Sequence, residues 1–382
     1  MSSSSTTRIG VVGAGQLARM LQPEVSALGA QLIVLDPSSH APACANADGV
    51  VVAGYHDPEG LRALAAQCDV LTVELEDVGV QTLAEIRDAG TPVYPDPDLI
   101  ATIRDKFLQK SAYRSLGIPT SEFAPVDPSR PEDFEAFGYP LVQKTRTGGY
   151  DGRGVAVLRG PEDWHKRLDA PSFVERMVEF TMEVGVMVAR TRDGEVRAFE
   201  PTEMVLDPQL NLLDLLVAPA RLDPEQNQAA RALACDVIEK LDGVGVFGVE
   251  LFLTPDGAFL VNEIAPRAHN SGHHSIEACQ TSQFGQQARI LLGLPLGSVE
   301  QPKPAALVNL IGEEGWSGET QVLGLDQALA IEGVSVHLYG KQECRAGRKM
   351  GHFSVTADTH EQALERAHRA KQLLKIKGRD PA

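Results

Sequence analysis

The stretch Lys144–Gly154 reads KTRTGGYDGRG, and it separates two apolar, strand-like runs, YPLVQ before it and VAVL after it. Its glycines expose backbone N–H groups that can wrap phosphate oxygens, and Lys144 and Arg146 add positive charge. It is not a Walker A loop, because it lacks the Gly-Lys-Ser/Thr ending and a strand rather than a helix follows it. The pattern predicts a phosphate-binding hairpin; the alternative is an ordinary solvated hairpin, since glycine is common in tight turns.

A second hairpin is predicted over Gly248–Glu263, GVELFLTPDGAFLVNE. A two-residue turn centred on Asp256 and Gly257 would place Glu250 directly opposite Glu263. Two like charges in that position, with Cβ atoms about 4.5–5.5 Å apart, are destabilising unless a cation intervenes. Mg²⁺ is commonly shared by carboxylates and nucleotide phosphates, so the pair predicts a metal site. The alternative is a register slipped by one residue, which would leave one glutamate on a solvated face.

The segment that follows, Ala265–His273, reads APRAHNSGH and places Arg267, His269, Asn270 and His273 within seven residues. Guanidinium and imidazole donors next to a metal strand suit a small oxyanion, because they can be aimed where negative charge develops. A single histidine would more often be structural, but four polar groups after a metal strand favour a functional cluster.

Near the N-terminus the sequence GVVGAGQLA fits a dinucleotide fingerprint through Gly13, Gly15 and Ala18, with Asp36 where a ribose-binding acid would lie. Apolar runs alternate with helical stretches from residue 8 to 94, which predicts βαβ units and a parallel sheet. A nicotinamide-dependent dehydrogenase is therefore one rival hypothesis. It leaves the lysine-containing glycine loop, the paired glutamates and the arginine–histidine segment unexplained.

The composition narrows the class of protein further. The chain has 382 residues, 43% of them hydrophobic, and no apolar run near the roughly 18 residues that span a bilayer. A net charge of −17 argues against nucleic-acid binding, and we expect no membrane partner. Five scattered cysteines without metal-ligand spacing, and a start without an apolar signal segment, predict a cytoplasmic protein. The basic run Lys341–Lys349 fits a phosphate-bearing substrate, although such runs are often only solvated surface.

The remaining elements follow from periodicity and turn signals. A helix carries Lys106 and Lys110, and the region 172–264 is mostly strand-like, interrupted by a helix near 224–241. A long helix is expected at 275–292, and the end of the chain holds three strand-like pieces and a helix from about His360. The predicted domains are 1–98, 99–170, 171–300 and 301–382.

Six motifs occur in one order: GxGQLxRM (13–20), VELE (73–76), DKxxQK (105–110), KTRTGGYDGRG (144–154), VNEIAPRxHNSGH (261–273) and GRKMGH (347–352). Over about residues 8–360 the chain therefore resembles the ATP-grasp superfamily, and within it the 5-(carboxyamino)imidazole ribonucleotide synthases of purine biosynthesis. The resemblance implies a mixed α/β and α+β fold, with an N-terminal Rossmann-like parallel-sheet domain, an ATP-grasp fold and a small C-terminal β-rich subdomain.

The resemblance also implies the reaction. Such enzymes use ATP and Mg²⁺, with Mn²⁺ as an alternative ion, to convert bicarbonate into carboxyphosphate. They then transfer the CO₂ unit to the amine of 5-aminoimidazole ribonucleotide. The resemblance also implies that the protein forms a homodimer. Two rival functions remain. One is another ATP-grasp ligase that activates an amino acid or formate, such as a formate-dependent phosphoribosylglycinamide formyltransferase, and the other is a non-catalytic nucleotide-binding regulator.

Site residues carry over from the family by matching position. Lys106 and Lys144 would contact the ATP phosphates, residues 149–155 would cover them, residues 175–178 would line the adenine edge, and Glu183 would bind the ribose hydroxyls. The full set of implied ATP contacts is Lys106, Lys144, Gly149, Tyr150, Asp151, Gly152, Arg153, Gly154, Val155, Glu175, Arg176, Met177, Val178, Glu183, Asn262 and Glu263. The implied metal ligands are Glu250 and Glu263. The implied catalytic residues are Arg267, His269, Asn270 and Lys349. The implied contacts to the ribonucleotide are Gly15, Gln16, Glu74, Tyr150, Asp151, Arg153, Lys341, Arg348 and Lys349.

The sequence departs from the family pattern in one place. Members often carry a histidine near ATP in a strand ending ENxHxxxIL, but the matching region here, residues 203–213, has Leu206 at that position and a loop about two residues longer. We assign no nucleotide contact there.

Overall fold

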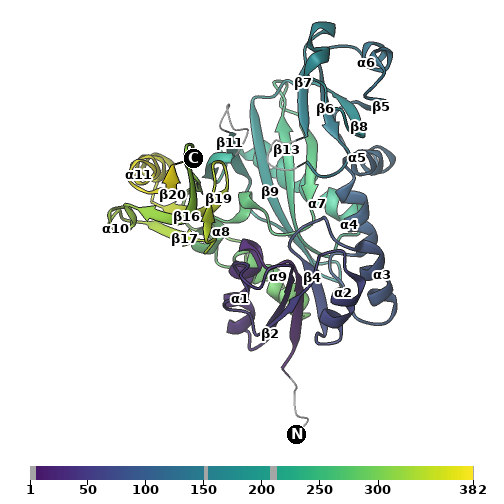
Figure 1. Cartoon of the computed structure of the whole chain (residues 1–382). Helices are drawn as coiled ribbons and strands as arrows, with labels where there is room; N and C mark the ends of the chain where they lie inside the picture. Colours follow the sequence, from purple (N-terminus) through teal and green to yellow (C-terminus); the bar gives the residue numbers. More distant parts are fainter. Residues whose placement is uncertain (1–5, 150–153, 207–212, 382) are drawn as a thin grey trace.

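The computed structural model describes residues 6–149, 154–206 and 213–381. The chain forms an N-terminal domain, a small upper sheet, a large central sheet and a C-terminal lobe, residues 305–381 (Figure 1). The lobe contributes three of its strands to the central sheet. Among the described residues, no helix has the length and apolar character needed to cross a membrane.

The N-terminal domain is the predicted parallel sheet, in the order β3-β2-β1-β4. Its strands are β1 (Arg8–Val12), β2 (Gln31–Asp36), β3 (Gly49–Val52) and β4 (Val70–Val73). The connecting helices are α1 (Gln16–Ala27), α2 (Pro58–Ala65) and α3 (Val80–Asp88). The apolar run near Val93, expected as a further strand, contributes only a single parallel bridge to Leu71.

The second part begins with helices α4 (Pro97–Arg104) and α5 (Lys106–Ser115) and continues into an antiparallel sheet, β5-β8-β6-β7. Its elements are β5 (Phe123–Val126), α6 (Pro131–Phe137), β6 (Leu141–Thr145), β7 (Val155–Leu158), the 3₁₀ helix η1 (Pro161–Lys166) and β8 (Ser172–Arg176). Lys144 on β6 pairs with Val155 on β7, so the glycine-rich stretch connects two paired strands, as predicted. We call this unit the upper sheet.

The large central sheet has the order β14-β13-β9-β11-β12-β15-β19-β17, with β10 paired to β9. Its strands are β9 (Met182–Arg190), β10 (Val196–Ala198), β11 (Thr202–Leu206), β12 (Leu213–Ala218), β13 (Gly245–Leu253), β14 (Phe259–Ala265), β15 (Ala305–Ile311), β17 (Val334–Leu338) and β19 (Lys349–Thr356). Helix α7 (Pro224–Lys240) buries Ala234 and Val237 against Val188 and Phe247 on one face of this sheet.

The prediction of one long helix at 275–292 is wrong. The structure has two separate helices there, α8 (Ser275–Ala278) and α9 (Gln283–Leu291), preceded by the 3₁₀ helix η2 (Asn270–Gly272). The chain breaks because Ser282 starts α9 as its N-cap, its Oγ accepting from the N–H of Gly285 at 2.9 Å. Helix α9 then packs on α1, with Phe284 and Ala288 sharing a buried core with Leu21. This contact holds the N-terminal domain against the central sheet.

The C-terminal residues divide between two sheets. Strands β15, β17 and β19 extend the central sheet, whereas β16 (Trp316–Leu323), β18 (Glu343–Cys344) and β20 (Lys375–Pro381) form a separate small sheet. The helices of this lobe are α10 (Leu325–Leu329) and α11 (His360–Leu373). The start of α11 matches the prediction, whereas β20 was not expected.

Candidate functional site

The predicted opposition of Glu250 and Glu263 is confirmed, although the predicted turn is wrong. Near the end of the hairpin Leu251 pairs with Val261 and Leu253 with Phe259, so the connection has five residues rather than two. A β-bulge then restores the register, and Glu250 pairs with Glu263. The extra residue is Asn262, whose Nδ2 lies 3.4 Å from Glu250 Oε2. The bulge thus gathers three oxygen-bearing side chains on one face.

Two lysines from other elements reach this face. Lys106, the first residue of α5, donates to the carboxylate of Glu263. Lys144 on β6 donates to Asn262 Oδ1 at 3.0 Å and lies 3.3 Å from Glu175 Oε2. The residues predicted to bind ATP phosphates therefore meet the predicted metal strand between the upper sheet and the central sheet.

The two glutamates differ in their electrostatics. Burial, and then the charge of Glu263, raises the pKa of Glu250 to about 8. Burial would also raise the pKa of Glu263, but Lys106 and Lys144 outweigh it and hold that pKa at about 2. Burial likewise raises the pKa of nearby Glu183 on β9 to about 7, opposed by Lys144 and assisted by Glu263. The site carries surplus carboxylates that a divalent cation would neutralise.

Other residues predicted to contact ATP are distributed as follows. Glu175 on β8 is 3% exposed and lies between two lysines, Lys110 and Lys144. Arg176 directs its guanidinium into the upper sheet, where it donates to the carbonyls of residues 137 and 138, while Met177 and Val178 follow at the strand end. The carbonyl of Gly154 accepts from the N–H of Thr145 at 2.9 Å. Tyr150, Asp151, Gly152 and Arg153 lie outside the described residues, as does most of the loop after Leu206.

The arginine–histidine segment leaves β14 beside the glutamates. His269 Nε2 is 3.5 Å from Glu250 Oε1, and its Nδ1 shares a hydrogen bond of 2.9 Å with Ser271 Oγ. Arg267 forms an ion pair of 3.0 Å with Glu76, which follows β4 in the N-terminal domain. Arg267 and His269 therefore lie at the junction of the N-terminal domain and the metal strand.

The other two polar residues of this segment contact other elements of the fold. Asn270 exchanges two amide hydrogen bonds with Asn309 on β15, at 3.0 and 2.7 Å. His273 is 2% exposed, accepts from Gln283 at 2.8 Å and packs 5.0 Å from the ring of His352. Burial and neighbouring His352 hold the pKa of His273 well below its usual value, so it is a neutral structural residue.

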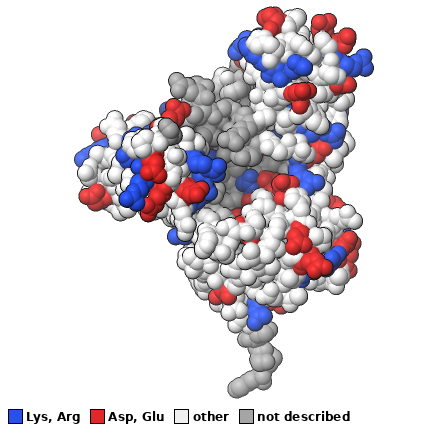
Figure 2. Space-filling model, in the orientation of Figure 1, with Lys and Arg blue, Asp and Glu red and all other residues white. Residues whose placement is uncertain are grey.

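The basic run lies in the C-terminal lobe, and the charge of Lys349 helps to lower the pKa of buried His273. Lys349 begins β19, three residues before His352, and its carbonyl accepts from Lys341 Nζ at 2.7 Å. Arg348 donates to the carbonyl of Glu343 at 2.5 Å. Lysine and arginine side chains of this lobe gather on the side that faces the middle of the molecule (Figure 2).

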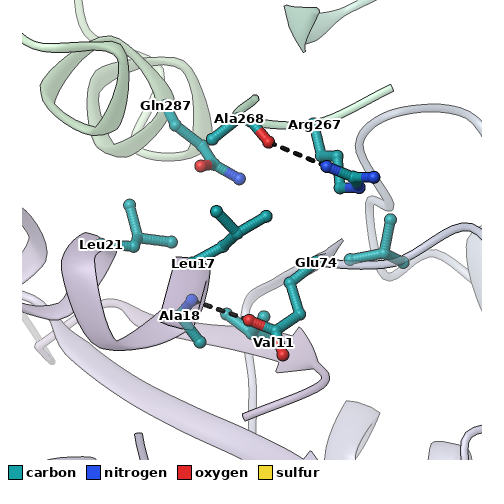
Figure 3. Close-up of a pocket in the computed structure, with 9 residues that line it drawn as sticks. Val11, Leu17, Ala18, Leu21, Glu74, Arg267, Ala268 and Gln287 are labelled. Atoms are coloured by element: carbon teal, nitrogen blue, oxygen red, sulfur yellow. Dashed lines mark hydrogen bonds between the residues drawn. The ribbon is translucent and has the colours of Figure 1, made fainter. Parts of the chain in front are cut away.

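The glycine turn of the N-terminal domain is already filled by the protein itself. The carboxylate of Glu74 accepts from the N–H of Gly15, and at 2.9 Å from that of Ala18 (Figure 3). Asp36 accepts from the N–H of Ala14 at 3.1 Å and from the hydroxyl of Tyr55 at 2.8 Å. The N-terminus of α1 therefore holds a carboxylate where a dinucleotide pyrophosphate would lie, which argues against the dehydrogenase hypothesis.

A small pocket lies beside this turn and links it to Arg267 (Figure 3). Its lining consists of Val11, Leu17, Ala18, Leu21, Val73, Glu74, Arg267, Ala268 and Gln287. Gly15 and Gln16 begin α1 next to it. Three residues predicted to bind the ribonucleotide, Glu74, Gly15 and Gln16, therefore lie at or beside the pocket that Arg267 also lines.

Sequence reasoning did not assign four residues that the structure brings to the site. Phe252 lies two positions after Glu250, on the same face of β13, and stacks on Phe180 at 4.7 Å. The period-two rule for strands would have found it. Lys110 and Asn309 carry no signal of a site role in the sequence. Only the structure shows that Lys110 pairs with Glu175 and that Asn309 is hydrogen-bonded to Asn270.

Three models of protein domains match successive parts of the chain. Residues 6–104 match the ribonucleotide synthetase preATP-grasp domain, 111–284 the ATP-grasp domain, and 305–366 the phosphoribosylaminoimidazole carboxylase C-terminal domain. A curated N5-carboxyaminoimidazole ribonucleotide synthase of Synechococcus elongatus is 40% identical, over 97% of this chain and 94% of that protein.

Two solved structures share the whole fold. N5-carboxyaminoimidazole ribonucleotide synthetase from Thermotoga maritima superposes with a TM-score of 0.91 at 44% identity, covering 98% of this chain and 100% of that one. The Aspergillus clavatus N5-carboxyaminoimidazole synthase, in complex with ADP and 5-aminoimidazole ribonucleotide, has a TM-score of 0.87 at 35% identity, covering 96% and 98%. The chain belongs to the N5-carboxyaminoimidazole ribonucleotide synthase family of ATP-grasp ligases.

Proposed function

We propose that the protein carboxylates 5-aminoimidazole ribonucleotide with bicarbonate and ATP, giving N5-carboxyaminoimidazole ribonucleotide, ADP and phosphate in purine biosynthesis. The observation that carries the proposal is the meeting of Glu250, Glu263, Lys106 and Lys144 with Arg267 at one junction. Carboxylates, phosphate-binding ammonium groups and an oxyanion-binding guanidinium are the groups that this reaction requires together.

The nucleotide would lie between the upper sheet and the central sheet. Lys144 and Lys106 would contact its phosphates, and Phe252 with Phe180 would supply apolar surface near the base. Among the described residues, no cluster of three acidic, histidine or cysteine side chains could hold a metal ion. The facing carboxylates of Glu250 and Glu263 fit a Mg²⁺ ion that takes its other ligands from phosphate and water. Bound there, Mg²⁺ would neutralise charge on the phosphoryl group during transfer.

Bicarbonate would lie near Arg267 and His269. It is a poor electrophile, and phosphorylation gives it a leaving group: a bicarbonate oxygen attacks the γ-phosphorus, and ADP departs with the bonding electrons. The amine nitrogen of the ribonucleotide then forms a bond to the carboxyl carbon, and phosphate leaves. Arg267 would stabilise the oxyanion, with Asn270 and Lys349 nearby, and water excluded from the site would protect carboxyphosphate.

The ribonucleotide would extend from Glu74 and the start of α1 toward Lys341, Arg348 and Lys349 of the C-terminal lobe. These groups come from the two ends of the chain: Glu74 lines the small pocket beside α1, and Lys341 and Lys349 contact each other in the C-terminal lobe. The basic side chains would bind its phosphate, and Tyr150, Asp151 and Arg153 would reach it from the glycine-rich loop.

ADP release measured in buffers depleted of one component tests the proposal. We expect release that requires bicarbonate and is stimulated by aminoimidazole ribonucleotide, with the carboxylated product identified by mass spectrometry of ¹³C-bicarbonate reactions. Full activity with formate in bicarbonate-depleted buffer would instead support the formyltransferase alternative. Tight NADH binding without any ADP release would overturn both.

Three further predictions accompany this function: domain borders near residues 98, 170 and 300, a homodimer and a cytoplasmic location. Sedimentation equilibrium tests the homodimer, for which we expect a mass near twice 41.1 kDa. A concentration-independent monomer would contradict it.

A further inference from the structure

Lys110 is a buried lysine to which the proposed function assigns no role. Its side chain is 3% exposed, and Nζ donates to Thr120 Oγ1 at 2.7 Å, Ser121 Oγ at 3.1 Å and the carbonyl of Val261 at 3.3 Å. A carboxylate oxygen of Glu175 lies 3.4 Å away. A buried ammonium is costly unless it is paired and hydrogen-bonded, and these four contacts come from three separate segments.

Glu175 lies between two lysines. Its Oε1 faces Lys110, while its Oε2 lies 3.3 Å from Lys144 Nζ and accepts from Ser121 Oγ at 3.1 Å. Burial would raise the pKa of Glu175, but Lys144 and then Lys110 outweigh it and keep the carboxyl ionised. One negative charge is therefore shared between two positive charges.

The three groups also connect the two sheets of the site. Glu175 belongs to β8 of the upper sheet, whereas the carbonyl of Val261 belongs to β14, one residue before Asn262. Lys144 contacts Glu175 and Asn262, and Lys110 contacts Glu175 and Val261. Both lysines thus span the same two strands, and the Lys144 side chain is 13% exposed whereas that of Lys110 is 3% exposed.

We propose that Lys110 is a positioning residue for Lys144: by sharing the charge of Glu175, it leaves the Lys144 ammonium aimed at the cleft and available to a nucleotide phosphate. Without Lys110, Glu175 and Lys144 would form a one-to-one buried ion pair, and the phosphate would have to compete with that carboxylate. The inference rests on the proposed function, since it assumes that Lys144 contacts ATP.

A purely structural ion pair would behave differently. It would change the free energy of unfolding, and replacing Lys110 would have the same effect on nucleotide affinity with or without Glu175. In a charge-sharing role, replacing Lys110 lowers nucleotide affinity only while Glu175 is present, because that carboxylate is what holds Lys144. The cycle of single and double variants therefore separates the two roles.

The experiment compares wild type, Lys110→Met, Glu175→Gln and the double variant by calorimetric titration with Mg²⁺·ADP and by steady-state kinetics. For Lys110→Met we expect ADP affinity to fall about tenfold, the equivalent of one charge-assisted contact, with the KM for the ribonucleotide unchanged. The double variant should bind ADP as tightly as Glu175→Gln alone, because without the carboxylate Lys110 has no charge to share. Wild-type affinity in Lys110→Met, or losses that simply add, would overturn the inference.

Two further variants keep the test decisive. If Lys110→Met fails to fold, Thr120→Val takes its place, because it removes the acceptor that lies nearest to Lys110 Nζ. This variant should weaken ADP binding severalfold, and unchanged binding would count against the inference. Arg190→Met removes a cation, 14% exposed and paired with Asp242, from the far end of β9 and should lower stability without changing ADP affinity. If wild type itself does not bind ADP, the proposed function fails rather than this inference.

Discussion

Glu250 and Glu263 pair directly across β13 and β14, yet the pKa values of their carboxyl groups are shifted in opposite directions, to about 8 and about 2. Burial and the neighbouring charge favour the neutral form of Glu250, whereas Lys106 and Lys144 hold Glu263 in the charged form. Two chemically identical residues at one register position therefore have different roles before any ligand binds.

This asymmetry predicts different behaviour of the two glutamine variants. Glu250→Gln replaces a carboxyl group that is mostly protonated at neutral pH, so the unliganded protein should keep its stability. Glu263→Gln leaves Lys106 without its carboxylate partner and should cost about 1–2 kcal/mol, a reduced figure because the Glu263 side chain is partly exposed. Urea unfolding without ligand measures both values.

Both variants should lose turnover and the stabilisation that Mg²⁺·ADP confers on wild type, because each lacks one proposed metal ligand. Thermal unfolding with and without Mg²⁺·ADP measures this loss. Glu85→Gln, at an exposed ion pair on α3, serves as the matched control. Wild-type rates in both active-site variants would disprove the metal role.

The C-terminal basic residues should act on the ribonucleotide rather than on ATP. We expect Lys341→Ala and Arg348→Ala each to raise the KM for aminoimidazole ribonucleotide about tenfold or more, since each would lose a charge-assisted phosphate contact. The KM for ATP should stay near the wild-type value. Initial rates at varied ribonucleotide test this, with Lys371→Ala on α11 as the control. An unchanged KM would place the phosphate site elsewhere.

Glu74 should stabilise the N-terminal domain. Glu74→Ala leaves the N–H groups of Gly15 and Ala18 without their acceptor, which should cost about 1–3 kcal/mol. Glu74→Gln keeps one acceptor oxygen and should cost less. Urea unfolding followed by circular dichroism gives both values. Equal stability of the alanine variant and wild type would show that these bonds contribute nothing net.

Stability should fall in mild acid because of His274. This residue is 1% exposed, and burial lowers its pKa from 6.5 to about 4. Below about pH 6.5 the unfolded chain therefore binds a proton that the folded protein excludes. The free energy of unfolding should drop by about 2 kcal/mol between pH 7.5 and 5 from this residue alone, at 1.36 kcal/mol per pKa unit.

His274→Asn tests this explanation, since asparagine can still donate to the carbonyl of Ser271, which His274 contacts at 3.0 Å, but cannot take up a proton. The variant should show a shallower loss of stability over the same pH range, whereas the exposed residue His40 changed to Asn should not alter the slope. Identical slopes for His274→Asn and wild type would refute the assignment. Buried His273 and His352, whose pKa values are also lowered by burial, should account for the loss that remains.

Several features followed from sequence because their cause is local. Alternating apolar runs and helices predicted the parallel N-terminal sheet, and the glycine-rich stretch between two apolar runs predicted the β6–β7 hairpin. The opposition of Glu250 and Glu263 was predicted correctly, although the predicted turn was too short. The longer turn shifts the strand register by one residue, and the bulge at Asn262 shifts it back. Turn length and bulges depend on packing across the strands, so their combination is not readable from spacing.

Other features had no local signal. The packing of α9 on α1, about 260 residues earlier in the chain, has no signal within residues 275–292, where one long helix was expected. The glycine turn at Gly13 satisfied a dinucleotide fingerprint, and only Glu74 filling the N-terminus of α1 shows why that ligand does not fit.

The sequence by itself determined the family, the two hairpins and the chemical types of the site residues, because motif spacing and strand periodicity are properties of short segments. Only the tertiary structure decided which glutamate is charged, that Asn270 is held by Asn309, and that Lys110 and Lys144 share Glu175. A buried charge takes its protonation state and its direction from the partners around it, and here those partners come from segments far apart in the chain.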